Sequence, residues 1–232
     1  MFGESHHSQR RPRFARIRTQ YEQDLVSLVE EQRARKSIML TSTIVLRIPP
    51  KLQMTDDEFF EFCQINSELR IERNKSGELL IMPPTGSETG NREGNIFGPL
   101  WVWAEENGSG LAFTSSTGFT LSTGAEKSPD AAWIKLERWN ALSPEQKQKF
   151  APICPDFVVE LRSASDNLKP LQEKMQEYMR EPGVQLGWLI DRKNRRVYIY
   201  RPGLPEECLE NPATVSGDPV LPGFVLNMSK IW

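Results

Sequence analysis

Two acidic residues and one lysine interrupt an otherwise apolar pattern between residues 128 and 188. Asp130 directly precedes the apolar run AAWI, Glu160 lies near the end of the run FVVEL, and Lys174 lies in the amphipathic segment that follows. Two carboxylates on neighbouring strands can hold a divalent cation through oxygen, and a nearby lysine can act on the water that attacks a phosphodiester. These three residues therefore predict metal-dependent phosphodiester hydrolysis.

Each of the three residues also has a structural interpretation that involves no chemistry. An aspartate that follows Pro129 and precedes a strand commonly caps a turn, so Asp130 need not bind anything. Glu160 is surrounded by apolar residues, where an ionised carboxylate is costly without a cation. That cation is either a bound metal or an ion-pair partner, Arg162 or Lys174. Lys174 itself could simply extend its ammonium group to water.

Histidine and cysteine usage excludes several kinds of active site. His6 and His7 are the only histidines, so residues 8–232 cannot supply a Ser-His-Asp or Cys-His mechanism. Cys63, Cys154 and Cys208 show no CxxC spacing, which argues against a thiolate zinc site and against a disulfide framework. Free cysteines without such a framework favour a reducing compartment, so we expect a cytoplasmic protein.

The elements that must position these residues are a strand, a helix and a second strand. The run 157–161 predicts a central strand buried on both faces. Apolar residues at helical spacing predict a helix over 166–180, which Pro182 and Gly183 end. A further strand over 185–191 then lies parallel to the first strand, as in a crossover connection.

The chain before these elements predicts a small antiparallel sheet with a helix packed on it. The hairpin over 69–84 turns at Lys75–Gly77, and Thr55 with Glu58 forms a capping box for the preceding helix. A second helix ends near Gly108. Glu88 lies at the start of that helix, where an acid is favoured by the helix dipole. It is either such a first-turn acid or a third carboxylate of the site.

Composition divides the chain into a tail and a body. Residues 1–38 are expected to form a flexible basic tail, and residues 39–232 a single domain. The tail has a cluster of arginines that could contact phosphate groups, namely Arg10, Arg11, Arg13, Arg16 and Arg18. The formal net charge of the whole chain is −2, so there is no global attraction to nucleic acid. No apolar run of eighteen residues occurs, so no membrane partner is expected.

The order and spacing of these segments resemble a known family. The segments are PDAAW, PDFVVELRSASD, LQEKMQEYMREPGVQLGWLID and VYIYRP. They resemble the Uma-two family of proposed restriction endonucleases, also called domain of unknown function 820, and the resemblance extends from about Thr55 to Trp232. This family is similar to the PD-(D/E)XK nuclease superfamily. The resemblance implies an α/β fold with a central mixed sheet flanked by helices, here with a small N-terminal antiparallel extension.

The resemblance also implies roles for individual residues. Asp130 and Glu160 match the two motif acids that hold Mg²⁺ or Mn²⁺, and Lys174 matches a lysine shifted onto the following helix. Glu88 resembles the acid of the first helix. DNA is the implied substrate, and a homodimer is expected because such nucleases cut two strands.

Arg162 departs from the superfamily pattern, which has lysine two residues after the strand acid. Arginine could hold the scissile phosphate, but its pKa prevents it from accepting a proton. Lys174 must then supply the lysine function. A lysine next to a metal ion is expected to have a depressed pKa and to orient or deprotonate the attacking water.

Two other classes of function fit the same residues. A catalytically inactive nuclease fold would use the acids as ion-pair partners and would act as a nucleic-acid or protein binding module. A glycoside hydrolase could use Asp130 and Glu160 as its two carboxylates. The tryptophans have a spacing typical of a core rather than of a sugar cleft, which makes the glycosidase the weakest of these hypotheses.

Overall fold

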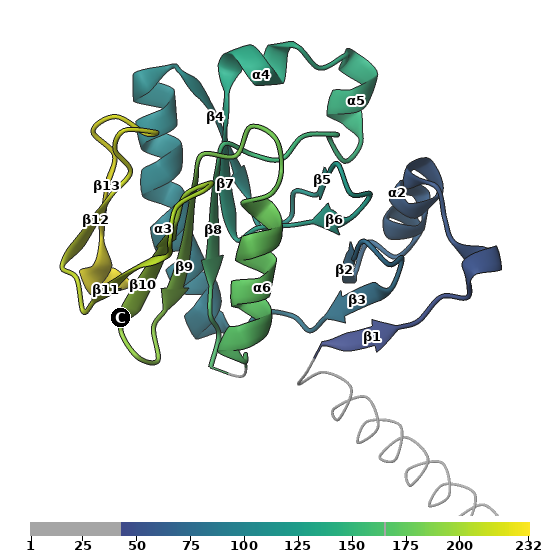
Figure 1. Ribbon diagram of the computed structural model, residues 1–232, viewed down its shortest axis with the longest axis horizontal. Helices are drawn as coiled ribbons and strands as arrows, with labels where there is room; N and C mark the ends of the chain where they lie inside the picture. The colour runs from purple at the N-terminus through teal and green to yellow at the C-terminus, as the bar shows by residue number, and fades with distance from the viewer. Residues whose placement is uncertain (1–42, 165) are drawn as a thin grey trace, which may run out of the picture. The chain divides into compact units, whose positions relative to one another are not determined.

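The computed structural model describes residues 43–164 and 166–232, whose helices and strands are drawn in Figure 1. All of these residues lie in one compact unit that spans Ser42–Trp232. The basic tail expected at residues 1–38 lies outside the described residues. The division into a tail and a domain over 39–232 therefore stays a prediction.

The larger sheet has six strands in the order β11-β10-β9-β8-β7-β4. Its strands are β4 (Gly110–Thr114), β7 (Ala131–Lys135), β8 (Phe157–Leu161), β9 (Leu186–Asp191), β10 (Arg196–Tyr200) and β11 (Glu207–Glu210). β8 and β9 pair in parallel, whereas the other neighbouring strands are antiparallel. This mixed sheet, flanked by helices (Figure 1), confirms the predicted fold class.

The crossover between β8 and β9 matches the sequence prediction. Every residue of both strands is buried, which is why the run FVVEL shows no alternation. Helix α6 (Leu168–Tyr178) connects the two strands and buries Met175 and Tyr178. The helix is shorter than the predicted range 166–180, because Asn167 is its N-cap and Met179 its C-cap.

The smaller sheet has five antiparallel strands in the order β1-β3-β2-β6-β5. They are β1 (Ile44–Leu46), β2 (Arg70–Arg73), β3 (Leu79–Met82), β5 (Phe119–Thr120) and β6 (Glu126–Lys127). The predicted hairpin is present as β2 and β3, but β5 and β6 extend the sheet beyond it. Since β6 is followed within four residues by β7, the chain passes directly from the smaller sheet into the larger one at Asp130.

Two of the helices begin or end at residues that the sequence predicted. α2 (Asp56–Ile65) starts with a capping box between Thr55 and Glu58. α3 (Ser87–Asn107) ends at Gly108, whose φ of 68° lies in the left-handed region that favours glycine. The remaining helices are short: η1 (Pro50–Leu52), α4 (Leu136–Asn140), α5 (Pro144–Gln148) and η2 (Met228–Lys230).

The C-terminal segment completes the core rather than a site. β12 (Thr214–Ser216) pairs with β13 (Val225–Asn227), and the segment between them stacks Phe224 on Trp188 of β9 with ring centroids 6.0 Å apart. Its buried apolar residues join the cluster that α3 forms with the larger sheet. Within residues 43–164 and 166–232, no helix is both long enough and apolar enough to cross a membrane.

Candidate active site

The two predicted acids lie at the same end of the larger sheet, on neighbouring strands. Ala131 of β7 pairs with Val159 of the antiparallel β8. Asp130 precedes the first residue of this pair and Glu160 follows the second, so both acids lie on the same side of it. The backbone N–H of Asp130 also donates to the Val159 carbonyl at 2.9 Å. The strand pairing therefore brings together two residues that are thirty positions apart in the chain.

Asp130 is held by one backbone donor and one cation. Its Oδ2 accepts a hydrogen bond from the backbone N–H of Leu161 at 2.7 Å, and its Oδ1 lies 3.2 Å from Nη2 of Arg70. The same Arg70 nitrogen donates to the carbonyl of Ser128 at 2.8 Å. Asp130 thus bonds across the strand pair and is not merely a turn cap.

Glu160 is almost completely buried, with 3% of its surface exposed. Its Oε1 lies 2.8 Å from Nζ of Lys174 and accepts a hydrogen bond from the Tyr178 hydroxyl at 3.1 Å. Burial raises the pKa of Glu160 to about 7; the charge of Lys174 opposes this rise, and the negative charge of Asp130 adds to it. Ionisation of this carboxyl group is therefore unfavourable near neutral pH.

Lys174 is bound by two carboxylates at once. Its Nζ lies 2.8 Å from Glu160 and 2.8 Å from Glu72. Burial lowers the pKa of Lys174, but the charges of Glu160 and Glu72 outweigh burial and raise it above its usual value. The depressed pKa was expected beside a bound metal ion, so it stays a prediction. Without a metal ion, the two carboxylates favour the charged form of Lys174.

Glu72 and its neighbours on the smaller sheet were missed by sequence reasoning. Glu72 of β2 is 3% exposed, accepts the backbone N–H of Ser128 at 3.0 Å and lies 3.7 Å from Nζ of Lys127. Burial raises its pKa, but the charges of Lys174 and Lys127 outweigh burial and lower it. Arg70 and Glu72 lie two positions apart on β2 and face the same way. Two charged residues on the same face of one strand are the feature of the sequence that could have indicated this part of the site.

The other two predicted residues, Glu88 and Arg162, have different partners. Glu88 lies in the first turn of α3, is exposed, and forms ion pairs with Arg92 at 2.7 Å and with Arg192 at 3.4 Å. Arg162 donates from Nη1 to both carboxylate oxygens of Asp191, at 3.0 and 2.9 Å. No contact joins either residue to the site acids in the described part of the chain. Glu88 is thus a first-turn acid of α3, and a part for it in the site stays a prediction.

Glu93 is the carboxylate of α3 that shares an environment with Asp130. It lies five residues after Glu88, and it is partly buried. Burial raises the pKa of Glu93, and the negative charge of Asp130 raises it further, whereas Arg70 opposes the rise. Glu93 is thus a carboxylate of α3 whose charge is coupled to that of Asp130.

The donor set suits a hard cation held by few protein ligands. Among residues 43–164 and 166–232, no group of three or more His, Cys, Asp or Glu side chains is arranged to hold a metal ion. Mg²⁺ is commonly bound through one or two carboxylates and keeps several waters or substrate oxygens. Asp130 and Glu160 supply oxygen ligands of that type and number, so the residues present fit Mg²⁺ or Mn²⁺.

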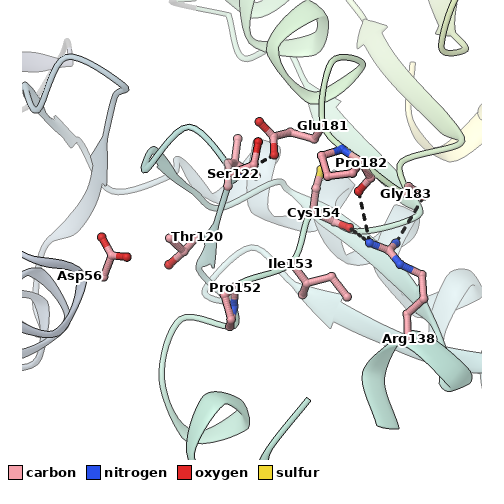
Figure 2. A pocket seen from close by; sticks show the side chains of 11 residues that line it. Asp56, Thr120, Ser122, Arg138, Pro152, Ile153, Cys154, Glu181, Pro182 and Gly183 are labelled. Carbon is pink, nitrogen blue, oxygen red and sulfur yellow. Dashed lines mark hydrogen bonds between the residues drawn. The ribbon is translucent and has the colours of Figure 1, made fainter. Parts of the chain in front are cut away.

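A pocket of about 440 Å³ lies elsewhere in the molecule (Figure 2). Arg138 fills one side of it and donates to the carbonyl oxygens of Cys154, Pro182 and Gly183 at 3.0 to 3.4 Å. None of the residues that line it belongs to the Asp130 and Glu160 site. The contacts of Arg138 thus form one wall of this pocket, which neither Asp130 nor Glu160 lines.

The mixed sheet with acids on two adjacent strands defines a restriction-endonuclease-like fold. The family model described as "Uma2: Putative restriction endonuclease" matches residues 56–229. The chain therefore belongs to the Uma2 family, which confirms the resemblance seen in the sequence. This family membership supports a nuclease and, with it, a nucleic-acid substrate.

A solved structure shares the same fold. It is the crystal structure of a protein from Anabaena variabilis ATCC 29413 that is described as "a putative nuclease belonging to DUF820". It is 19% identical to this chain with a TM-score of 0.61, and the match covers 77% of this chain and 97% of that one. Comparison with curated proteins gave no match.

Proposed function

We propose that this protein is a metal-dependent endonuclease that hydrolyses phosphodiester bonds of DNA. The observation that carries the proposal is the meeting of Asp130, Glu160 and Lys174 at one end of the larger sheet, with Nζ of Lys174 2.8 Å from Glu160. Family membership supports the nuclease class independently. A lysine held between two buried carboxylates is found more often where the charges serve a reaction, which supports the proposal.

In this proposal Asp130 and Glu160 hold Mg²⁺ or Mn²⁺, with the backbone carbonyl of Leu161 as a third oxygen donor. The bound ion supplies charge neutralisation at the phosphate and lowers the pKa of water. Arg70 keeps the Asp130 carboxylate in place through its 3.2 Å contact. Lys174 remains charged and donates a hydrogen bond that orients the attacking water, while Glu72 fixes the position of its ammonium group.

The test combines calorimetry with cleavage of plasmid DNA. Wild type should bind Mg²⁺ or Mn²⁺ and cut the plasmid, and the double variant Asp130→Asn, Glu160→Gln should lose metal binding. Its cleavage rate should fall roughly 100-fold or more. Glu105→Gln is the matched control, because Glu105 is an exposed acid near the other end of α3. Cleavage that survives in the double variant, with its fold shown intact by circular dichroism, would falsify the proposal.

One observation favours a second function, that of a catalytically inactive binding module. The carboxylates already have cationic partners within the chain, since Asp130 pairs with Arg70 and Glu160 and Glu72 share Lys174. Such a network can persist as a purely structural feature. In that case calorimetry would detect no metal binding with or without a DNA duplex, and DNA binding, if present, would not depend on metal.

Three further properties belong to this proposal. A homodimer would place two sites on the two strands of a duplex, and sedimentation of the purified chain with and without DNA tests it. The preference for DNA is tested by offering RNA of the same sequence. The cytoplasmic location, inferred from cysteine usage, is tested by fractionation of cells that express the chain.

A further inference from the structure

The turn that joins β9 to β10 is strongly basic. It contains Arg192, Lys193 and Arg195, with Asn194 as its only neutral residue, and Arg196 begins the next strand. We call residues 192–196 the basic turn. The complete chain carries a net charge of −2. An attraction to polyanions must therefore come from a local cluster of cations, and this turn is such a cluster.

The basic turn lies at the same end of the larger sheet as the candidate active site. β8 and β9 are parallel, and Glu160 of β8 pairs with Leu189 of β9. Arg192 follows Leu189 by three residues, which is about 10 Å along an extended strand. Figure 1 shows the β9–β10 turn at the end of the sheet where β8 also ends. The contact between Arg192 and Glu88 further places the start of α3 beside this turn.

Two of the four cations have no counter-charge among the residues that the structure describes. Arg196 lies 2.8 Å from Glu210, and Arg192 lies 3.4 Å from Glu88. Lys193 and Arg195 are exposed and form no ion pair with any residue in 43–164 and 166–232. Solvated cations without protein partners can exchange their counterions for phosphate groups, which is the source of salt-dependent binding to nucleic acid.

The basic turn is also held rigidly. Asp191 accepts hydrogen bonds from the backbone N–H groups of Lys193 at 3.1 Å and Asn194 at 3.4 Å, and from the Asn194 side chain at 2.7 Å. Arg162 in turn holds both oxygens of Asp191. A preformed turn presents its charges without a further cost of ordering its backbone. Arg162, which the sequence suggested as a site residue, thus supports the turn.

Arg195 occupies a backbone conformation that is not favourable for arginine. Its φ is 51°, in the left-handed region where glycine and asparagine are found more readily. Its side chain forms no ion pair with a described residue that would explain its presence. An exposed cation in this conformation at the end of the turn fits a surface that binds an anion.

We infer that the basic turn binds the phosphate backbone of duplex DNA a few nucleotides from the bond that is cut. The inference rests on the proposed nuclease function, since it takes the position of the scissile bond from Asp130 and Glu160. Lys193 and Arg195 provide the phosphate contacts, and Asp191 with Arg162 positions them. These contacts carry no sequence information and fix only the register of the duplex on the protein.

The experiment measures DNA binding as a function of salt for three full-length proteins. The test variant is Lys193→Gln, Arg195→Asn, because asparagine tolerates a positive φ. The matched control, Lys75→Gln, Arg180→Gln, also removes one lysine and one arginine, both of which are exposed. Each protein is titrated with a fluorescent 20-base-pair duplex without divalent metal, and its thermal unfolding is recorded. The tail at residues 1–38 is the same in all three, so its contribution cancels.

The expected result is a smaller salt dependence in the test variant alone. Each lost phosphate contact reduces the slope of log K against log salt by about 0.9, so the double variant should lose about 1.8. Its affinity at low salt should fall roughly tenfold, for every duplex sequence tried. The control should match wild type in its salt dependence, and neither variant should unfold at a lower temperature than wild type.

Three outcomes would overturn the inference. They are an unchanged slope in the test variant, an equal loss in the control, and a wild type that binds no duplex DNA at low salt. A change seen only with duplex RNA would assign the surface to RNA and reject DNA. The nuclease proposal fails separately, because it depends on metal binding and cleavage by the Asp130 and Glu160 variants. Wild-type cleavage with an unchanged slope therefore rejects the basic turn and keeps the nuclease.

Discussion

Asp156 and Glu160 are buried carboxylates at the two ends of one strand, and their surroundings differ. Asp156, just before β8, has one cation, Arg138, at 2.8 Å and a neutral donor, the backbone N–H of Lys135, at 3.0 Å. Glu160, near the end of β8, must share Lys174 with Glu72. One end of the strand thus has a complete ion pair, whereas the other has two acids on one lysine.

The difference between the two ends is larger when all charged residues linked to Glu160 are included. Around Glu160 the linked charges are five acids and three cations: Glu72, Glu93, Asp130, Glu160 and Glu177 against Arg70, Lys127 and Lys174. An excess of negative charge around a buried carboxylate is unfavourable to folding and favourable to binding a cation. The comparison teaches that a buried carboxylate by itself indicates little. The balance of charge around it separates a structural ion pair from a candidate metal site.

The largest stability effect is expected when Lys174 is removed. Lys174→Met leaves Glu160 and Glu72 buried without their shared cation, which should cost about 4 kcal/mol at pH 8. The cost should shrink toward pH 5 as the carboxyl groups take up protons. Urea unfolding at both pH values measures it. Lys169→Met, an exposed lysine on the same helix, is the control and should change little. Equal stability of Lys174→Met and wild type at pH 8 would contradict the model of a shared cation.

The next effect has the opposite sign and concerns Glu160. Its pKa is raised to about 7 in the folded protein, so the folded state binds more protons than the unfolded state between pH 4.5 and about 7. Stability should therefore fall as pH rises through this window, by on the order of 3 kcal/mol for this group alone. Glu160→Gln should remove this fall and be more stable than wild type at pH 8.

The difference between the two proteins at each pH isolates Glu160, because the pKa of Glu126 is also raised to about 7 and contributes to both. Thermal unfolding from pH 4 to pH 9 provides the curves. If wild type and Glu160→Gln show the same dependence of stability on pH, ionisation of the buried Glu160 does not destabilise the folded protein.

Asp156 should behave in the reverse manner. Asp156→Asn removes the counter-charge of Arg138, whose side chain is one quarter exposed, and should cost about 2 kcal/mol. The cleavage rate per folded molecule should not change, because Asp156 lies at the opposite end of β8 from the candidate site. Urea unfolding and plasmid cleavage are measured on the same preparation. If Asp156→Asn lost as much cleavage activity as the Asp130 and Glu160 double variant, Asp156 would not be a purely structural carboxylate.

The larger sheet and three residues of the candidate site could be predicted from the sequence. A charged residue inside an apolar run is costly, so Glu160 was conspicuous within FVVEL. Asp130 at the start of an apolar run and Lys174 on the amphipathic helix were assigned by their match to the family motif. The runs themselves indicated buried strands, and the helix between two of them required a parallel crossover. Local pattern therefore located both the strands and the residues on them.

Contacts between the two sheets could not be predicted in the same way. Glu72 meets Lys174 across 102 positions of the chain, and the hairpin signal did not indicate which face of β2 would meet the larger sheet. Strand alternation shows that Arg70 and Glu72 share a face, but not whether that face is buried or in water. The second carboxylate beside Lys174 was not predicted for this reason, since it comes from the smaller sheet.

The sequence also did not show which face of α3 is buried, so it drew attention to Glu88 and not to Glu93. These two residues give the prediction with the smallest expected effect. The two residues are five positions apart on α3, about 140° around the helix, so they face different surroundings. Arg92 lowers the pKa of Glu88, which makes its charge stabilising above the unfolded pKa, with the benefit lost as pH falls. Burial raises the pKa of Glu93, which makes its charge destabilising at high pH. The free energy of unfolding of Glu88→Gln, measured relative to wild type, should thus be slightly lower at pH 8 than at pH 4. The same difference for Glu93→Gln should be slightly higher at pH 8 than at pH 4. Thermal unfolding at the two pH values measures both differences. If both variants changed in the same direction between pH 4 and pH 8, the two carboxylates would not have opposite effects on stability.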